Sequence, residues 1–416
     1  METLQPKLRF PEFEGNVDYS YKKQSFEDVF LFSTGKNIKQ NEASPEFETL
    51  CVRYGELYHM YDEVIRLVIN RTNLNKSDLL FSQGDEILLP SAGEDPLDIG
   101  SASALTVENV AIGRTINILK PLKQNVYSNI YAAYYINHKL RAKIATLAKG
   151  VSISNVYNSD LKTLEIILPT LEEQTRIANF LSSVDEKLNL LKEKRSLLEE
   201  YKKGIMQKIF NQELGFKDDN GNDFEDWKES ILSEVVNLFH GYQFRTSDFT
   251  SKGIAVIKIS NVIGNNLDLN NLTFIKKERF EDFKSFEIKN DDILMSLTGN
   301  IGRIIEVKDK PFSLLQNYRV GKFIPLDENV INKPFLKYLL ASDLVFGRFS
   351  QLANQSAQAN FGKQDMDKIN ISYPTIEEQN KISNFLSTID EKIELVSNQI
   401  QDTQEYKKGL LQQMFV

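Results

Sequence analysis

The chain has 416 residues, and 58 Asp and Glu residues outnumber its 50 Lys and Arg residues, which gives a formal net charge of −8. This balance excludes a protein that holds nucleic acid through an overall basic surface, so any such contact has to use local basic residues or a partner. The single cysteine, Cys51, excludes an intramolecular disulfide and a cysteine metal cluster, and no apolar stretch approaches the roughly 18 residues of a membrane span. Because the N-terminus also lacks a signal-peptide pattern, we expect a cytoplasmic protein without membrane contact.

Residues 1–169 are predicted to form the first of two strand-rich α+β domains. Short β-branched runs such as 164–168 alternate with Gly, Asn and Asp turns, which is typical of strands, and residues 129–148 are predicted as a helix. A glycine loop, Ser91-Ala92-Gly93, follows an apolar run at 85–89.

Residues 170–212 are predicted as the first of two long helices. Pro169 and the Thr170-x-x-Glu173 pattern indicate a capping box, in which the threonine accepts from a backbone N–H and the glutamate reaches back to the cap N–H. Arg195 and Lys202 interrupt the apolar pattern; polar residues there either fix register and partner choice or mark the solvated flank of a bent helix. Apolar residues at alternating steps of four and three predict a coiled-coil seam of Ile177, Leu181, Val184, Leu188, Leu191 and Leu198.

Residues 213–374 are predicted as a second domain of the same kind. The Asp291-Asp292-Ile293-Leu294-Met295 run matches Asp85-Glu86-Ile87-Leu88-Leu89 at an offset of 206, and a glycine loop again follows. We expect strands at 254–259 and 320–324 and a helix at 334–351.

Residues 375–416 are predicted as the second long helix, and they repeat the first. Residues 169–210 and 374–415 align without a gap at an offset of 205, and half of the aligned positions are identical. This indicates a tandem duplication. The second predicted seam is Ile382, Leu386, Ile389, Ile393, Val396 and Ile400.

The predicted fold class is therefore α+β, with an internal pseudo-twofold repeat. Two strand-rich domains are separated by two long helices, and an antiparallel coiled coil is the simplest pairing that buries both seams.

Motifs for catalysis are absent from the sequence. It contains neither a Gly-x-x-x-x-Gly-Lys-[Ser/Thr] loop nor a Gly-x-Gly-x-x-Gly fingerprint, and no Pro-Pro dipeptide. His59, His138 and His240 are far apart in sequence, and the Asp291-Asp292 pair is typical of a turn at a strand entry. We expect no catalytic residue, no metal site and no cofactor bound by this chain.

The repeated helix entry carries a family resemblance. The pattern Pro-Thr-[Leu/Ile]-Glu-Glu-Gln-x-x-Ile-x-x-Phe-Leu starts at Pro169 and again at Pro374, each time after a globular domain. Together with the opening Pro6-Lys7-Leu8-Arg9-Phe10-Pro11-Glu12-Phe13 and the Gly84-Asp85-Glu86-Ile87-Leu88 run, it resembles the specificity subunit of type I restriction–modification systems.

The resemblance implies a non-catalytic subunit that reads DNA. Each globular part would be a target-recognition domain for one half of a split, asymmetric site in double-stranded DNA. The helices would be a spacer and a docking surface for two methyltransferase (modification) subunits, which bring S-adenosylmethionine and methylate adenine N6. Restriction subunits, which use ATP and Mg, could join for cleavage.

Sequence reading in the major groove needs paired donors and acceptors, such as Arg on guanine and Asn or Gln on adenine. Polar Gly/Asn loops supply such residues in both domains, although such loops are often only turns; Glu94-Asp95-Pro96-Leu97-Asp98 is an insertion in one of them. The predicted DNA contacts in the first domain are Thr34, Lys36, Asn37, Ser91, Arg114, Lys149, Ser152, Ser154 and Asn155. Those in the second domain are Tyr242, Gln243, Arg245, Thr298, Asn300, Arg303, Asn317, Arg319, Asn354, Gln355, Ser356, Gln358 and Asn360.

Two other interpretations compete with this one. A coiled-coil adaptor would bind proteins through its helices and read no DNA, and it would show apolar patches in place of Asn/Gln/Arg loops on both domains. A solitary DNA methyltransferase or nuclease is disfavoured by the absent motifs, and cofactor dependence of the isolated chain would reveal it.

Overall fold

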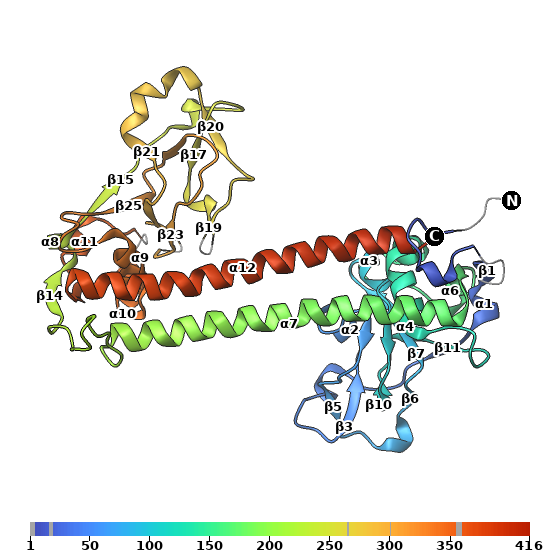
Figure 1. Cartoon of the computed structure of the whole chain (residues 1–416). Coiled ribbons are helices and arrows are strands. Elements are labelled where there is room, and N and C mark those ends of the chain that lie inside the picture. Colours follow the sequence, from blue (N-terminus) through green and yellow to red (C-terminus); the bar gives the residue numbers. More distant parts are fainter. Residues whose placement is uncertain (1–4, 16–19, 264–265, 300, 355–359) are drawn as a thin grey trace. The chain divides into compact units, whose positions relative to one another are not determined.

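The computed structural model describes residues 5–15, 20–263, 266–299, 301–354 and 360–416 (Figure 1). The chain divides into two compact units. Unit 1 comprises Met1–Glu193 and Ser397–Val416, and unit 2 comprises Lys194–Val396. Each unit therefore holds one globular part and segments of both long helices.

Unit 1 contains two main sheets and two strand pairs. Strand β7 is buried at all five positions, as expected for the centre of a sheet that is covered on both faces. The five-stranded sheet has the order β2 (Phe30–Thr34), β11 (Ile116–Pro121), β7 (Glu86–Pro90), β9 (Ser103–Leu105) and β4 (Val64–Ile65). The four-stranded sheet has the order β5 (Arg71–Thr72), β3 (Thr49–Val52), β10 (Glu108–Ile112) and β6 (Phe81–Gln83). The pairs are β1 (Lys22–Ser25) with β13 (Glu165–Leu168) and β8 (Ala92–Gly93) with β12 (Ser154–Asn155).

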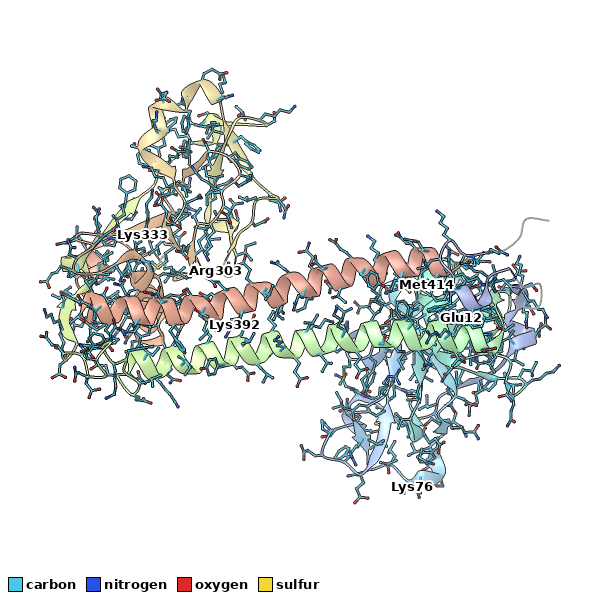
Figure 2. All side chains as sticks on the ribbon, viewed as in Figure 1. Glu12, Lys76, Arg303, Lys333, Lys392 and Met414 are labelled. Carbon is cyan, nitrogen blue, oxygen red and sulfur yellow. The ribbon has the colours of Figure 1, made fainter. Side chains whose placement is uncertain are left out.

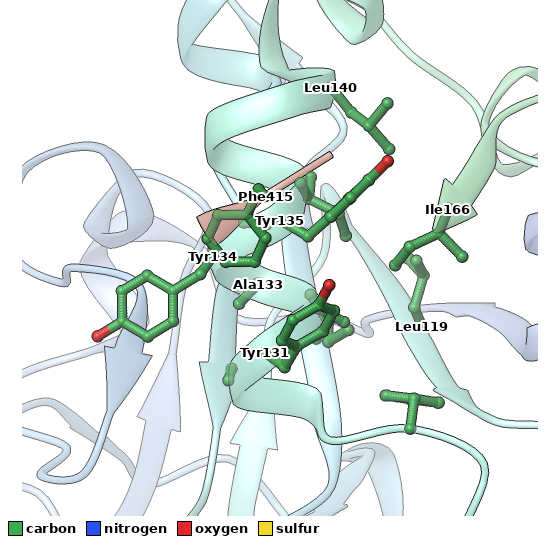
Figure 3. Close-up of a cluster of buried hydrophobic side chains, with 14 of the residues drawn as sticks. Leu119, Tyr131, Ala133, Tyr134, Tyr135, Leu140, Ile166 and Phe415 are labelled. Carbon is green, nitrogen blue, oxygen red and sulfur yellow. The ribbon is translucent and has the colours of Figure 1, made fainter. Parts of the chain in front are cut away.

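The helix predicted at 129–148 has a π turn in its middle. It consists of α4 (Asn129–Tyr135), the π turn η5 (Ile136–Leu140) and α5 (Arg141–Leu147). Tyr131 and Tyr135 on α4 pack against Phe415, and their ring centroids lie 5.3 and 5.9 Å, respectively, from that of Phe415 (Figure 3). The remaining helical turns of this globular part are η1 (Pro11–Phe13), α1 (Phe26–Val29), η3 (Gln40–Glu42), α2 (Glu56–His59), η4 (Lys76–Asp78), α3 (Pro96–Ile99) and α6 (Asn158–Leu161).

Unit 2 repeats this plan. Strand β22, like β7, is wholly buried. The four-stranded sheet has the order β15 (Val236–His240), β25 (Val320–Pro325), β22 (Ile293–Ser296) and β23 (Ile304–Glu306). The five-stranded sheet has the order β16 (Phe249–Thr250), β20 (Thr273–Ile275), β17 (Ile254–Ile257), β24 (Leu314–Gln316) and β21 (Glu287–Ile288). The pairs are β14 (Lys228–Ile231) with β26 (Asn370–Tyr373) and β18 (Val262–Ile263) with β19 (Asn266–Leu267).

The helix predicted at 334–351 is two helices, α9 (Lys333–Ala341) and α10 (Asp343–Asn354). Ser342 between them is extended, and its carbonyl accepts from Phe346 N at 2.8 Å, so the serine ends one helix and starts the next. The short turns are α8 (Leu232–Val235), η6 (Thr246–Asp248), η7 (Ile259–Asn261), η8 (Lys277–Arg279), η9 (Glu281–Phe286) and α11 (Lys363–Met366).

The long helices are α7 (Leu171–Phe210) and α12 (Ile376–Met414). In unit 1 Asp185 of α7 pairs with Lys407 of α12, and in unit 2 Asp390 of α12 pairs with Lys202 of α7. Within each unit the two helix segments run antiparallel (Figure 1). The α+β fold class with two repeats is thus confirmed. Nine of the seam residues are buried, and Leu191, Leu198 and Ile393 are half-buried.

The predicted capping boxes are only half formed. Thr170 Oγ1 accepts from Glu173 N, and Thr375 Oγ1 from Glu378 N, both at 3.5 Å. In the first box the second bond, from the cap N–H to the glutamate, is not made. The buried carboxylate of Glu173 instead accepts from Arg9 Nε at 2.8 Å.

Candidate nucleic-acid interface

The four predicted loops of the first domain converge in unit 1. Gly35 N donates to Ile116 O at 3.0 Å and Arg114 N to Asn37 O at 2.9 Å, which joins the loop after β2 to the loop before β11. Ser91 N donates to Thr115 O at 2.9 Å, and Val156 N to Ser91 O at 3.0 Å, which adds the remaining two loops.

We call this set of loops, residues 34–38, 91–93, 113–115 and 149–155, the unit 1 loop surface. Lys149 and Asn155 exchange backbone hydrogen bonds of 2.9 and 2.8 Å, so the last loop is a closed hairpin. The exposed predicted contacts on this surface are Thr34, Lys36, Asn37, Arg114, Lys149 and Ser152. Ser91 and Asn155 are half-buried, and Ser154 is buried by the β8–β12 pair.

Two β-branched residues of this surface have a strained backbone. Ile38 has φ 53° and Thr115 has φ 66°, a region that β-branched residues rarely adopt. Gly35 is required here, because a Cβ on it would lie 1.9 Å from Gly113 O. Such strain is often retained at functional sites. Sequence reasoning missed Ile38 and Thr115, since nothing in an apolar or β-branched residue signals a left-handed backbone.

Unit 2 builds the same arrangement from different side chains. Tyr242 N donates to Gln316 O at 2.9 Å, and Tyr318 N to Tyr242 O at 3.0 Å. Leu297 N donates to Arg319 O at 2.9 Å, and Phe361 N to Leu297 O at 2.8 Å. The described parts of the loops at 241–245, 297–303, 316–319 and 360–361 form the unit 2 loop surface.

Arginines and one aromatic cluster dominate the unit 2 loop surface. Arg319 donates through Nε to Tyr318 Oη at 2.7 Å and lies over the same ring. Tyr242 is 37 % exposed, and its ring packs on Phe283 at 4.7 Å. Arg303 donates through Nη1 to Val262 O at 3.3 Å and is half-buried.

The other predicted contacts of unit 2 vary in accessibility. Gln243, Arg245 and Asn360 are exposed, Thr298 is half-buried, and Asn317 is buried with Oδ1 accepting from Arg319 N at 3.3 Å. Thr298 pairs through its backbone with Asn360. Asn300, Gln355, Ser356, Gln358 and the side chain of Asn354 lie outside the described residues.

The histidines and acids do not form a metal site in the part of the chain that the structure describes, which holds no suitable group of three His, Cys, Asp or Glu residues. Burial lowers the pKa of His138 and of His240 below the usual value, so both imidazoles are neutral near pH 7. Among the described helices, none is both long and apolar enough to cross a membrane.

Each globular part is fastened to the helices by a repeated glutamine. Buried Gln174 accepts from Ser128 N at 2.9 Å and donates to Pro169 O at 2.9 Å. Its repeat, Gln379, accepts from Asn332 N at 3.0 Å and donates to Pro374 O in the same way. The glutamine of the repeated motif therefore joins the start of each long helix to the start of a domain helix.

In each unit a second contact between the long helices and the globular part is an ion-pair cluster around a lysine of a long helix. We call this cluster the lysine junction. In unit 1, Lys407 contacts Asp185 at 2.7 Å and Glu63 at 3.2 Å. Burial lowers the pKa of Lys407, but these two carboxylates outweigh it, and the pKa lies above its usual value.

The junction in unit 2 uses the residues at the equivalent helix positions. Lys202 contacts Asp390, which Lys337 also contacts at 3.2 Å and to which Tyr338 Oη donates at 2.8 Å. Burial raises the pKa of Asp390, but the two lysines outweigh it, so the pKa lies below its usual value. The interrupting Lys202 is therefore paired and does not lie on a solvated flank.

Comparison with known proteins gives one consistent family. The family described as "Type I restriction modification DNA specificity domain" matches residues 20–200 and again 224–404, so each match covers one globular part and most of its helix. The chain is 28 % identical over 352 residues to the type I restriction enzyme MjaVIII specificity subunit of Methanocaldococcus jannaschii, covering 81 % of this chain and 80 % of the relative. It is 25 % identical over 286 residues to the EcoBI specificity subunit of Escherichia coli, covering 62 % and 59 %.

Solved structures share the fold. The crystal structure of a type I restriction–modification S subunit from M. genitalium aligns with a TM-score of 0.64 at 17 % identity, covering 99 % of both chains. A chain from a study of complex assembly and conformational transition of the type I system aligns with a TM-score of 0.54 at 14 % identity, covering 95 % of this chain and 97 % of that one.

Proposed function

Because this chain belongs to the type I restriction–modification specificity family, we propose that it reads a bipartite, asymmetric sequence in double-stranded DNA, one half-site per unit. The observation that supports this most is the pair of loop surfaces. Both converge through equivalent backbone hydrogen bonds, yet they present different side chains. Two repeats that share a backbone arrangement but differ in their exposed loop side chains suit a protein that reads two unlike half-sites.

The exposed side chains have the chemistry that this reading needs. Arg114, Arg245 and Arg319 can donate two parallel hydrogen bonds to guanine, and Asn37 and Gln243 can pair with adenine. Contacts between cationic side chains and phosphates fix the register of a protein on the duplex but do not read its sequence. Lys36 and Lys149 are suited to make such phosphate contacts. Lys149 also contacts Asp160 at 2.7 Å, so its phosphate contact competes with an ion pair.

Catalysis would belong to partner subunits in the cytoplasm. Two methyltransferase subunits would bind S-adenosylmethionine and methylate adenine N6, and restriction subunits would add ATP- and Mg-dependent cleavage. This chain would supply recognition and docking, and no cofactor is assigned to it.

The decisive experiment is co-expression with the neighbouring methyltransferase subunit in a host that lacks adenine methylation, followed by modified-base sequencing. We expect N6-methyladenine in one split, asymmetric motif, and no such motif when this chain is omitted. A stable complex that methylates no motif would contradict DNA reading and favour the adaptor.

The adaptor remains the second candidate because of one observation. Val151 and Ile153, at the tip of the closed hairpin, are 104 % and 59 % exposed, which is apolar surface within a polar loop. In the DNA reading these side chains would contact thymine methyl groups. Replacing both by Ser should then change one half-site of the methylated motif, whereas an adaptor would lose a protein partner.

Modularity can be tested by exchange. Replacing residues 213–374 with the equivalent domain of a relative should change one half-site only, and a change in both halves would contradict one domain per half-site. Inserting one heptad into both long helices should lengthen the unread gap between the half-sites. An unchanged gap would contradict the helices as the spacer.

A further inference from the structure

A tight turn on the unit 2 loop surface brings a tyrosine and an arginine together. Asn317 O accepts from Val320 N at 2.9 Å, so residues 317–320 form a β-turn with Tyr318 and Arg319 at its two corner positions. Asn317 Oδ1 also accepts from Arg319 N at 3.3 Å. The predicted DNA contacts include Arg319 but not Tyr318.

Neighbouring segments fix the backbone of this turn at both corners. Tyr318 N donates to Tyr242 O at 3.0 Å, and Leu297 N donates to Arg319 O at 2.9 Å. The imidazole of His240 also hydrogen-bonds to the backbone of Tyr318. With the backbone fixed, the position of the guanidinium depends on the side-chain torsions of Arg319 alone.

Tyr318 restrains those torsions. Arg319 Nε donates to Tyr318 Oη at 2.7 Å, and the guanidinium carbon lies 5.3 Å from the centre of the tyrosine ring. The aromatic face attracts the cation, and the hydrogen bond fixes its orientation. The tyrosine is half-buried, whereas the arginine is exposed. Tyr318 therefore orders a cation that solvent can reach.

The contact with Tyr318 leaves the terminal nitrogens of Arg319 available. It uses one of the five N–H donors of the guanidinium, and no described residue accepts a hydrogen bond from Nη1 or Nη2. These two nitrogens can bind O6 and N7 of a guanine in the major groove, or two phosphate oxygens. A guanidinium that is already ordered loses less freedom on binding, which favours a directional contact.

The other arginines of the two loop surfaces are not ordered in this way. Arg303, labelled in Figure 2, is half-buried and donates through Nη1 to Val262 O at 3.3 Å. Arg114 and Arg245 are exposed, and their guanidinium groups donate to no described residue. Among the described residues of both surfaces, Arg319 alone combines exposure with a fixed guanidinium.

The corresponding positions in unit 1 keep the backbone bonds but carry other side chains. Arg114 N donates to the loop after β2, as Tyr318 N does to the loop after β15. Thr115 O accepts from the loop after β7, as Arg319 O does from the loop after β22. The same two places therefore hold Arg-Thr in unit 1 and Tyr-Arg in unit 2, as expected where two unlike half-sites are distinguished.

We propose that Tyr318 is a positioning residue for sequence reading by unit 2, and that it holds Arg319 so that Nη1 and Nη2 donate to O6 and N7 of one guanine. This inference rests on the proposed function. It adds a residue outside the predicted contacts and a base, because the half-site read by unit 2 then contains a G·C pair at the position of Arg319.

The test measures base preference position by position. The full chain is co-purified with the methyltransferase subunit, and the complex methylates DNA libraries in which each base pair of the unit 2 half-site is varied. The domain exchange at 213–374 identifies that half. Arg319→Ala should lower the preference for guanine at one position by roughly tenfold or more, because a bidentate contact is lost. Arg319→Lys should lose the same preference, because lysine keeps the charge but not the planar pair of donors.

Tyr318→Phe tests the positioning role, because it keeps the ring and removes the hydroxyl. The preference for guanine should fall by about fivefold at the position that Arg319→Ala affects, and nowhere else. A merely structural role would not single out one base pair. The matched control is Arg348→Ala, which removes an exposed arginine of α10 outside the unit 2 loop surface and should leave every preference unchanged. An unchanged unit 1 half-site shows that each variant folds.

Several outcomes would overturn the inference and leave the proposed function intact. One is a unit 2 half-site without a G·C pair, and another is a guanine preference that survives Arg319→Ala. A third is an equal loss on all sequences with a salt slope reduced by about one, which would identify a phosphate contact. A preference lost with Arg319→Ala but unchanged by Tyr318→Phe would overturn the positioning role. Absence of any methylated motif from the unchanged chain would instead remove the proposed function.

Discussion

Glu173 and Glu378 occupy the same place in the two repeats, yet their surroundings differ. Glu173 is buried and accepts from Arg9 Nε and Nη2 at 2.8 and 2.7 Å and from Tyr21 Oη at 3.1 Å. Glu378 accepts from Phe216 N at 3.3 Å and from the side chain of Trp227, and burial raises its pKa. One carboxylate is neutralised by a cation, and the other accepts from neutral donors.

This difference indicates which contacts would persist if a globular domain were exchanged for that of a relative. Gln174 and Gln379 keep the same partners in both units, because they bond to backbone that any domain can supply. The glutamates are met partly by side chains, those of Arg9, Tyr21 and Trp227, from segments that diverged. Domains exchanged between relatives should therefore carry their own partner for this glutamate.

Removing the cation from unit 1 should have the largest effect. Arg9→Met leaves the fully buried Glu173 charge without its ion pair, and breaking a buried pair from one side costs about 3–5 kcal/mol. The loss should be measured by denaturant titration followed by hydrogen exchange of peptides from 171–181. Trp227→Phe, its counterpart in unit 2, removes one hydrogen bond and should cost about 1 kcal/mol.

The control for this comparison is the double variant Arg9→Met with Glu173→Gln. It removes the charge and should recover most of the lost stability. Equal losses from Arg9→Met and Trp227→Phe would contradict the contrast between the two glutamates.

The lysine junctions should respond unequally. Lys407→Met leaves Asp185 and Glu63 facing each other without a cation and should cost about 2 kcal/mol. Lys202→Met should cost about 1 kcal/mol, because Lys337 still pairs with Asp390. Hydrogen exchange of each unit measures these two losses of stability. A larger loss from Lys202→Met than from Lys407→Met would show that Lys337 alone does not neutralise Asp390.

Relief of strain should produce a smaller change of the opposite sign. Thr115→Gly removes a β-branched residue from φ 66° and should stabilise unit 1 by about 1 kcal/mol. If the strain shapes the loop surface, methylation of the motif should fall while the unfolding midpoint rises. Lower stability would show that the threonine side chain is needed for packing.

The smallest expected effect is in the pH profile of unit 2. The pKa of Asp390 is depressed, so its contribution is present above roughly pH 3.9, the unfolded pKa, and is lost as the pH falls through the folded pKa. The pKa of Glu378 is raised, so its contribution is complete below roughly pH 4.3 and is lost as the pH rises through the folded pKa. Glu378→Gln should remove this second loss and flatten the profile of unfolding midpoint above pH 4. An unchanged slope would show that the glutamate does not titrate with folding.

The sequence allowed the fold class to be predicted because its signals are local or repeated. Heptad spacing predicts long helices, and a gapless duplication of the helices predicts that both halves share one plan; both were confirmed. The candidate loops were chosen for their Gly, Asn, Gln and Arg content. Their convergence follows from the pairing of β11 with both β2 and β7, which local patterns do not specify.

What the sequence did not predict depends on residues far apart in the chain. Arg9 meets Glu173 across 164 residues, and Lys407 meets Glu63 across 344. Periodicity carries no information at that range. The first capping box lacks its glutamate bond for the same reason, because the distant Arg9 offers the buried carboxylate of Glu173 more than a local N–H does.

The discontinuity of unit 1 has a consequence for synthesis. On the ribosome, all of unit 2 emerges before residues 397–416, yet Leu410, Met414 and Phe415 belong to the core around Tyr131 and Tyr135. A nascent chain therefore lacks part of the unit 1 core until residues 410–415 have emerged, and apolar surface exposed in this way attracts chaperones or aggregates. Premature termination near residue 409 would release a chain whose unit 2 sequence is intact and whose unit 1 core is unsealed.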